Sequence, residues 1–119
     1  MAGRRGIGEL EEQVMTYLWA IGDRATASEV HQAVASELAY TTVMTVLARL
    51  WKKELLTRER LGRAFAYKAA EPEAAHRAEQ MRSAFNDAPD PIAVLSSFVD
   101  SLDADDVSAL RRILDTEES

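Results

Sequence analysis

The sequence predicts a mainly α-helical protein with a small β-hairpin, and three observations point to this fold class. Apolar residues recur at helical spacing along most of the 119 residues. An alternating, extended pattern replaces that spacing over residues 56–68. A break rich in proline and aspartate, at residues 86–91, separates the later helices. We expect a domain at 1–70 and a helical region at 71–119, because a chain of this length supports one domain of about 70 residues and an appendage that buries little alone.

Three helices are predicted in the first half of the chain. The first covers about residues 9–20, where apolar side chains recur every three or four positions. The second opens at Thr26, which has the Thr-x-x-Glu form of a capping box with Glu29, and it runs to about residue 36. The third covers about residues 41–53 and has one apolar side and one polar, basic side.

A β-hairpin is predicted directly after the third helix. Residues 56–60 and 64–68 alternate in polarity and flank a turn at Leu61-Gly62-Arg63. Glycine at position 62 can supply the positive φ that a tight turn requires. Three helices followed by a basic hairpin is the element order of a winged helix-turn-helix. The sequence therefore predicts an N-terminal winged helix-turn-helix.

The last fifty residues read as three helices with more apolar side chains than they can hide. The helices are expected at residues 73–85, at 91–101 and from Asp103 onward, where Asp103 serves as a cap. A second copy of the chain would cover the apolar side chains, so this is a predicted helical dimerisation region. The alternative is that the segment packs back onto its own N-terminal domain. The predicted dimer contacts are Ile92, Leu95, Phe98, Val99, Leu102, Val107, Leu110 and Leu114.

The charge is distributed unevenly along the chain. The net charge of −6 disfavours nucleic acid at first sight, because DNA affinity comes largely from neutralised phosphates. However, residues 1–70 hold ten Lys or Arg against eight Asp or Glu, and the remainder holds four against twelve. Residues 49–68 alone hold seven basic residues against two acidic ones. This asymmetry indicates a basic binding surface joined to an acidic assembly region.

The candidate binding residues lie on the third helix and at the hairpin tip. Short polar side chains followed by Arg and Lys fit a helix in the major groove, and an Arg at the tip of a wing can reach the adjacent backbone. A solvated helix face and a solvated hairpin are the alternatives. A further alternative is a winged-helix module whose basic face docks an acidic protein. The predicted DNA contacts are Thr41, Thr42, Thr45, Arg49, Lys52, Lys53 and Arg63.

Little material for catalysis or metal binding is present. The chain has no cysteine and two histidines, His31 and His76, and it contains no phosphate-binding loop, nucleophile elbow or zinc motif. We expect no enzyme activity, no cofactor and no metal. Trp19 and Trp51 are expected in the core. No signal peptide or membrane segment is evident around Arg4 and Arg5 or elsewhere, so a cytoplasmic protein is expected.

Three blocks of sequence carry a resemblance to a known family. They are residues 8–15 (GELEEQVM), which Leu18-Trp19 follows, residues 39–47 (AYTTVMTVL) with Arg49-Leu50, and residues 62–67 (GRAFAY). In this order they resemble the penicillinase repressor family (BlaI/MecI/CopY), which places them on its first helix, recognition helix and wing. The resemblance implies a homodimeric transcriptional repressor on a palindromic operator, with β-lactamase-type resistance genes as candidate targets. It also implies that Thr41, Thr42, Thr45, Arg49 and Arg63 contact DNA and that apolar residues from Ile92 to Leu114 form the dimer.

Two departures from the family pattern concern induction. Copper-responsive members use a C-terminal cysteine motif, which this chain lacks. β-Lactam-responsive members are cleaved by an inducing protease at an Asn-Phe bond, and the comparable place here is Ser97-Phe98. The neighbouring asparagine is Asn86, which follows Phe85. The sequence leaves open whether a protease inactivates this chain.

Overall fold

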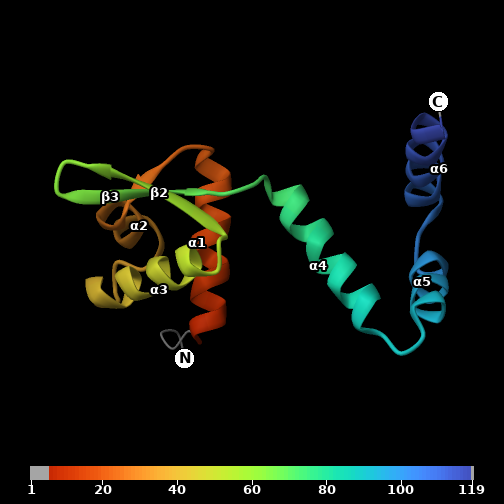
Figure 1. The fold of residues 1–119 in the computed structure, drawn as a ribbon, viewed down its shortest axis with the longest axis horizontal. Coiled ribbons are helices and arrows are strands. Elements are labelled where there is room, and N and C mark those ends of the chain that lie inside the picture. The colour runs from red at the N-terminus through yellow and green to blue at the C-terminus, as the bar shows by residue number, and fades with distance from the viewer. Residues whose placement is uncertain (1–5, 119) are drawn as a thin grey trace. The chain divides into compact units, whose positions relative to one another are not determined.

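A computed structural model describes residues 6–118, so Arg4 and Arg5 lie outside the described residues. The chain divides after His76 into two compact units, which are described separately. Figure 1 shows the order of the helices and strands. The elements are α1 (Ile7–Ile21), β1 (Ala25–Thr26), α2 (Ala27–Val34), α3 (Tyr40–Lys52), β2 (Leu56–Leu61), β3 (Ala64–Ala69), α4 (Glu73–Asp87), α5 (Pro91–Asp100) and α6 (Ala104–Glu118).

The helix ends follow local signals in the sequence. Helix α1 ends at Gly22, which adopts a left-handed conformation with φ of 65° that other residues rarely tolerate. The predicted capping box at α2 is confirmed: the backbone N–H of Glu29 donates to Thr26 Oγ1 at 3.2 Å, and the backbone N–H of Thr26 donates to Glu29 Oε1 at 2.9 Å. Two orphan donors are thereby satisfied at the start of a short helix.

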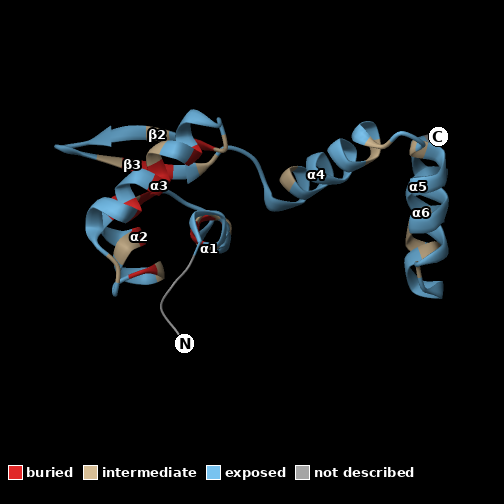
Figure 2. Cartoon of the chain, turned by 90° about the horizontal axis from the view of Figure 1, so that it is seen from below, coloured by how far each residue is buried: buried red, intermediate tan, exposed pale blue. Residues whose placement is uncertain are grey.

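A single apolar core joins the three helices of the first unit to its sheet. The buried residues, which Figure 2 colours red, come from α1, α2, α3 and the strands. Burial of a Leu or Val side chain contributes about 1.5–3 kcal/mol, so this shared core fixes the packing of α3 against α1. The largest fully buried side chains are Val14, Leu18, Val30, Val43, Leu47 and Leu50.

The predicted hairpin is present, but the sheet has a third strand that the sequence analysis missed. Strands β2 and β3 pair antiparallel with Leu61 opposite Ala64, and Gly62 between them has φ of 62°. Strand β1 pairs antiparallel with β3, so the strand order is β1-β3-β2. Two residues are too few to show an alternating pattern, and β1 exists because β3 offers it a hydrogen-bonding edge.

The second unit consists of short helices with capped ends and little burial. The predicted cap at Asp103 is confirmed, since its side chain accepts a hydrogen bond from the backbone N–H of Asp106 at 2.8 Å. Helix α5 has a cap that the sequence analysis did not predict: Asp90 accepts from the backbone N–H of Ala93 at 3.1 Å. An apolar hollow of about 460 Å³ lies between α4 and α5, lined by Met81, Phe85, Val94, Leu95 and Phe98 among others. No helix in residues 6–118 combines the length and the apolar character that crossing a bilayer requires.

Candidate nucleic-acid interface

Helix α3 buries one side and exposes a polar stripe on the other. Its buried residues are Val43, Val46, Leu47 and Leu50, whose spacing of three and four defines one helix face. The predicted binding residues on the stripe, Thr41, Thr42, Thr45, Arg49 and Lys52, are all exposed. The core therefore holds α3 so that its stripe faces outward.

The threonines of the stripe present methyl groups as well as hydroxyls. Thr45 Oγ1 donates a hydrogen bond to the backbone carbonyl of Thr41 at 2.9 Å. This bond occupies the hydroxyl hydrogen of Thr45, so that the side chain offers an acceptor oxygen and a methyl group to a partner. A methyl group of this kind can contact the C5-methyl of thymine in the major groove.

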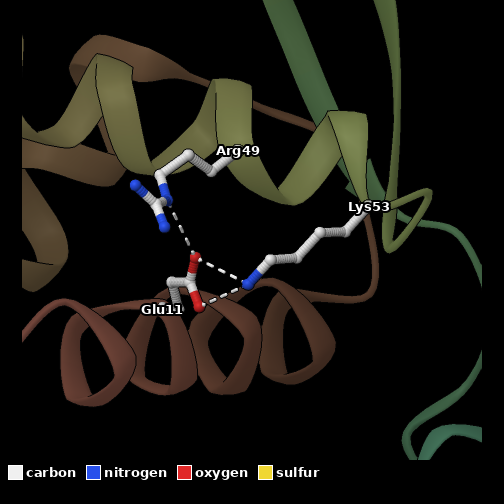
Figure 3. A network of polar contacts seen from close by, with 3 residues as sticks. All are labelled: Glu11, Arg49 and Lys53. Atoms are coloured by element: carbon white, nitrogen blue, oxygen red, sulfur yellow. Dashed lines mark hydrogen bonds and ion pairs between the residues drawn. The ribbon is translucent and has the colours of Figure 1, made fainter.

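Two of the predicted contact residues are ion-paired within the protein. Figure 3 shows Glu11 of α1 facing Arg49 of α3 and Lys53, the C-cap residue that follows α3. The Lys53 Nζ donates to both carboxylate oxygens of Glu11, at 3.0 and 3.2 Å. The Nε of Arg49 lies 3.6 Å from Glu11 Oε2. Sequence analysis did not find Glu11, because nothing local connects residues 42 positions apart.

The remaining predicted cations, Lys52 and Arg63, behave differently. Both are exposed, and neither side chain has a hydrogen bond or ion pair to another residue within the part of the chain that the structure describes. Arg63 lies in the turn that joins β2 to β3, directly after the left-handed Gly62. These two side chains are available to an external anion.

An arginine of the hairpin is stacked between two aromatic rings. The Arg58 guanidinium carbon lies 3.6 Å from the ring centroid of Trp51 and 4.1 Å from that of Phe65. This stack links the end of α3 to the sheet. Trp51 was predicted in the core, and this was wrong: it is 37% exposed and covers Arg58. Trp19, by contrast, is partly buried against the core.

Glu59 is paired across the sheet with Arg24, which precedes β1. The Arg24 Nη1 donates to Glu59 Oε1 at 2.5 Å. This hydrogen bond, together with the negative charge of Glu59, raises the pKa of the Arg24 guanidinium above its ordinary value. One of the two acidic residues on the basic stretch is therefore neutralised locally.

Both histidines have structural contacts. The ring Nε2 of His31 lies 2.7 Å from the carbonyl oxygen of Leu38 and its ring meets Tyr40 edge-on, which braces the turn between α2 and α3. The His76 ring lies 5.2 Å from that of Trp19. Across residues 6–118, no three His, Asp or Glu side chains are grouped so as to hold a metal ion.

The predicted dimer residues form a separate set on the second unit. Five of them are exposed in the single chain: Ile92, Leu95, Phe98, Val99 and Leu114. The other three, Leu102, Val107 and Leu110, are half-buried. Ile92 is 69% exposed, which is high for a side chain of this size and apolar character.

The chain is similar in sequence to known proteins. The sequence profile of the penicillinase repressor family matches residues 7–116. Two curated relatives from Mycobacterium tuberculosis, from strains CDC 1551 / Oshkosh and ATCC 25618 / H37Rv, are each called "Transcriptional regulator BlaI". Each is 40% identical over 119 aligned residues, which cover 96% of this chain and 86% of the relative.

Solved structures show a weaker likeness. MepR, a transcription regulator of the Staphylococcus aureus multidrug efflux pump MepA, has a TM-score of 0.48 and 17% identity over 91% of this chain and 75% of its own. Lactococcus lactis ZitR, a zinc-responsive MarR family member, has a TM-score of 0.47 and 15% identity over 98% of this chain and 79% of its own. These scores are low, so the fold assignment rests on the helices and strands described above. From the family match and the 40% identity, the chain belongs to the penicillinase repressor family and is a winged-helix transcriptional repressor.

Proposed function

We propose that this repressor binds a short, approximately palindromic operator as a homodimer, with α3 in the major groove and the β2–β3 wing on the adjacent backbone. The observation that carries the proposal is the polar stripe of α3, which is exposed along its length while the opposite side of the helix is buried. A helix held in this way can enter a groove without disturbing the core.

Base reading is assigned to the stripe and phosphate contact to the cations around it. Thr41, Thr42 and Thr45 offer hydroxyl and methyl groups to base edges. Lys52 and Arg63 are exposed cations suited to phosphate, which binds Lys and Arg without regard to sequence. Arg49 and Lys53, which are ion-paired with Glu11, are also assigned to the DNA-contacting surface.

A second copy of the chain is the proposed cover for the apolar side chains of α5 and α6. Phe98, Leu95 and Val99 are 44%, 45% and 40% exposed. Burial of each contributes about 1.5–3 kcal/mol, which over several residues per subunit exceeds the lower estimates of the association cost. A twofold dimer also explains why an operator would be palindromic, since two α3 helices then read two half-sites.

The remaining assignments follow from this role. Residues 1–70 bind DNA and residues 71–119 dimerise, in a cytoplasmic protein that needs no catalytic site, cofactor or metal. The family description, penicillinase repressor, supports β-lactamase-type resistance genes as targets. An inducing protease is the proposed signal partner, and the segment around Ser97-Phe98 lies within α5, so cleavage there would require local unfolding of that helix.

Selection of bound duplexes from a genomic library tests the proposal directly. A shared palindromic sequence is expected, bound at least about a thousand times more tightly than a random duplex of equal length. Enrichment without a common sequence, together with tighter binding to an acidic protein than to DNA, would replace the proposal with a protein-docking role.

The dimer is tested separately with Phe98→Asp. A charged carboxylate on the apolar face of α5 should yield monomers in analytical ultracentrifugation and should weaken operator binding strongly, because one half-site is then bound at a time. Ser97→Asp, an exposed polar position on the same helix, is the matched control and should remain dimeric. A dimeric Phe98→Asp variant would move the interface to another surface.

A further inference from the structure

We propose that Glu11 is a specificity-determining residue, which holds Arg49 and Lys53 so that they contribute to operator binding but little to binding of random DNA. The inference rests on the proposed function and extends it to a residue on α1, outside the recognition helix and wing. It is carried by the geometry of the three side chains drawn in Figure 3.

The Glu11 side chain is more buried than the side chains of the two cations that it pairs with. The Glu11 side chain is 14% exposed, while the side chains of Arg49 and Lys53 are each 51% exposed. Its two oxygens accept from the Lys53 ammonium, and one of them also faces the Arg49 Nε. A carboxylate covered in this way loses little rotamer freedom in holding two longer side chains.

The same carboxylate reduces the positive charge that a duplex meets. One negative charge lies within 3.6 Å of two positive ones, so the cluster presents a net charge of about +1 rather than +2 to distant phosphates. Random duplex is bound almost entirely through phosphate neutralisation. Glu11 therefore weakens non-specific binding in particular.

Operator binding depends instead on where the guanidinium of Arg49 points. Glu11 faces the Nε of Arg49, and within residues 6–118 the two Nη groups form no hydrogen bond or ion pair. Those groups form the edge that pairs with guanine or with a phosphate. A guanidinium already oriented loses less freedom when it binds, so Glu11 favours the specific complex through preorganisation.

The two effects are separated by two substitutions at the same position. Glu11→Gln removes the charge and keeps the shape, so random-duplex affinity should rise about three- to tenfold and its salt dependence should steepen by about one phosphate contact. Glu11→Asp keeps the charge and shortens the reach by one methylene. It should leave random-duplex affinity unchanged and weaken operator binding about three- to tenfold, because Arg49 is no longer held. Both variants should lower the operator-to-random ratio.

Glu12→Gln is the matched control, since Glu12 is exposed on the same turn of α1 and contacts neither Arg49 nor Lys53. Thermal unfolding and circular dichroism should confirm that all three variants keep the fold. The proposal is overturned if Glu11→Gln and Glu12→Gln change random-duplex affinity and salt dependence equally, or if Glu11→Asp binds the operator as tightly as the parent.

Failure of the proposed function would look different. A parent protein that selects no operator would refute operator binding, while the random-duplex measurements on Glu11→Gln and Glu12→Gln would still decide whether Glu11 restrains binding to phosphates.

Discussion

Substitution of Arg58 by Met should loosen the wing from the recognition helix at a measurable cost in stability. The Arg58 guanidinium carbon lies 3.6 Å from the ring centroid of Trp51 on α3 and 4.1 Å from that of Phe65 on β3. A cation over an aromatic ring contributes about 0.5–1 kcal/mol at partly exposed sites. Two such contacts put the expected loss in the free energy of unfolding at about 1–2 kcal/mol. Methionine keeps most of the apolar stem, so the loss reports the stacked charge.

The assay is urea unfolding followed by circular dichroism, at one fixed protein concentration because dimerisation would otherwise shift the apparent stability. Arg60→Met is the matched control: the Arg60 guanidinium carbon lies farther from the same Phe65 ring, at 5.3 Å. It should cost less than about 0.5 kcal/mol. In a Trp19→Phe background the emission of Trp51 should also change with Arg58→Met and not with Arg60→Met.

A stacked arginine also has a consequence for DNA. If the stack orients the wing, Arg58→Met should weaken operator binding although the stripe of α3 is untouched. The reasoning is refuted if Arg58→Met unfolds at the same urea concentration as the parent, or if it is no less stable than Arg60→Met. Equal losses from both variants would mean that net charge, and not stacking, sets the effect.

Three further substitutions test the fold and the interface. Thr26→Ala removes the hydroxyl that accepts from the Glu29 backbone at 3.2 Å and should lower the free energy of unfolding by about 0.5–2 kcal/mol in urea, with Thr26→Ser restoring most of it. Leu47→Ala removes a side chain from a residue that is 0% exposed and should lower the free energy of unfolding by about 2–5 kcal/mol in the same assay. A smaller loss would mean that the core collapses around the cavity. Arg63→Ala should leave the free energy of unfolding unchanged and should weaken binding to operator and random duplex alike. In fluorescence anisotropy, the salt dependence of binding should decrease by about one phosphate contact. An unchanged salt dependence would remove Arg63 from the phosphate contacts.

Sequence reasoning found the elements whose signals are local. The helical spacing of the core residues, the Thr26 and Glu29 capping box, the left-handed turn at Gly62 and the Asp103 cap each depend on residues a few positions apart. Such features are encoded by side-chain period and backbone preference, which a single sequence displays directly. The polar stripe of α3 was predicted for the same reason, because its residues occupy the helical positions between those of the buried residues.

The tertiary structure alone decided how the candidate site is assembled. Strand β1 exists because β3 lies beside it, and Trp51 is turned outward although Leu47 and Leu50, at neighbouring helical positions, are buried. The pairing of Glu11 with Arg49 and Lys53 joins α1 to the end of α3 across 42 positions of sequence in the case of Lys53. These contacts depend on which faces two elements turn toward each other. Burial of the shared core determines those faces. Residue spacing within α1 or α3 could therefore not reveal that Arg49 and Lys53, two of the predicted DNA contacts, are ion-paired with Glu11.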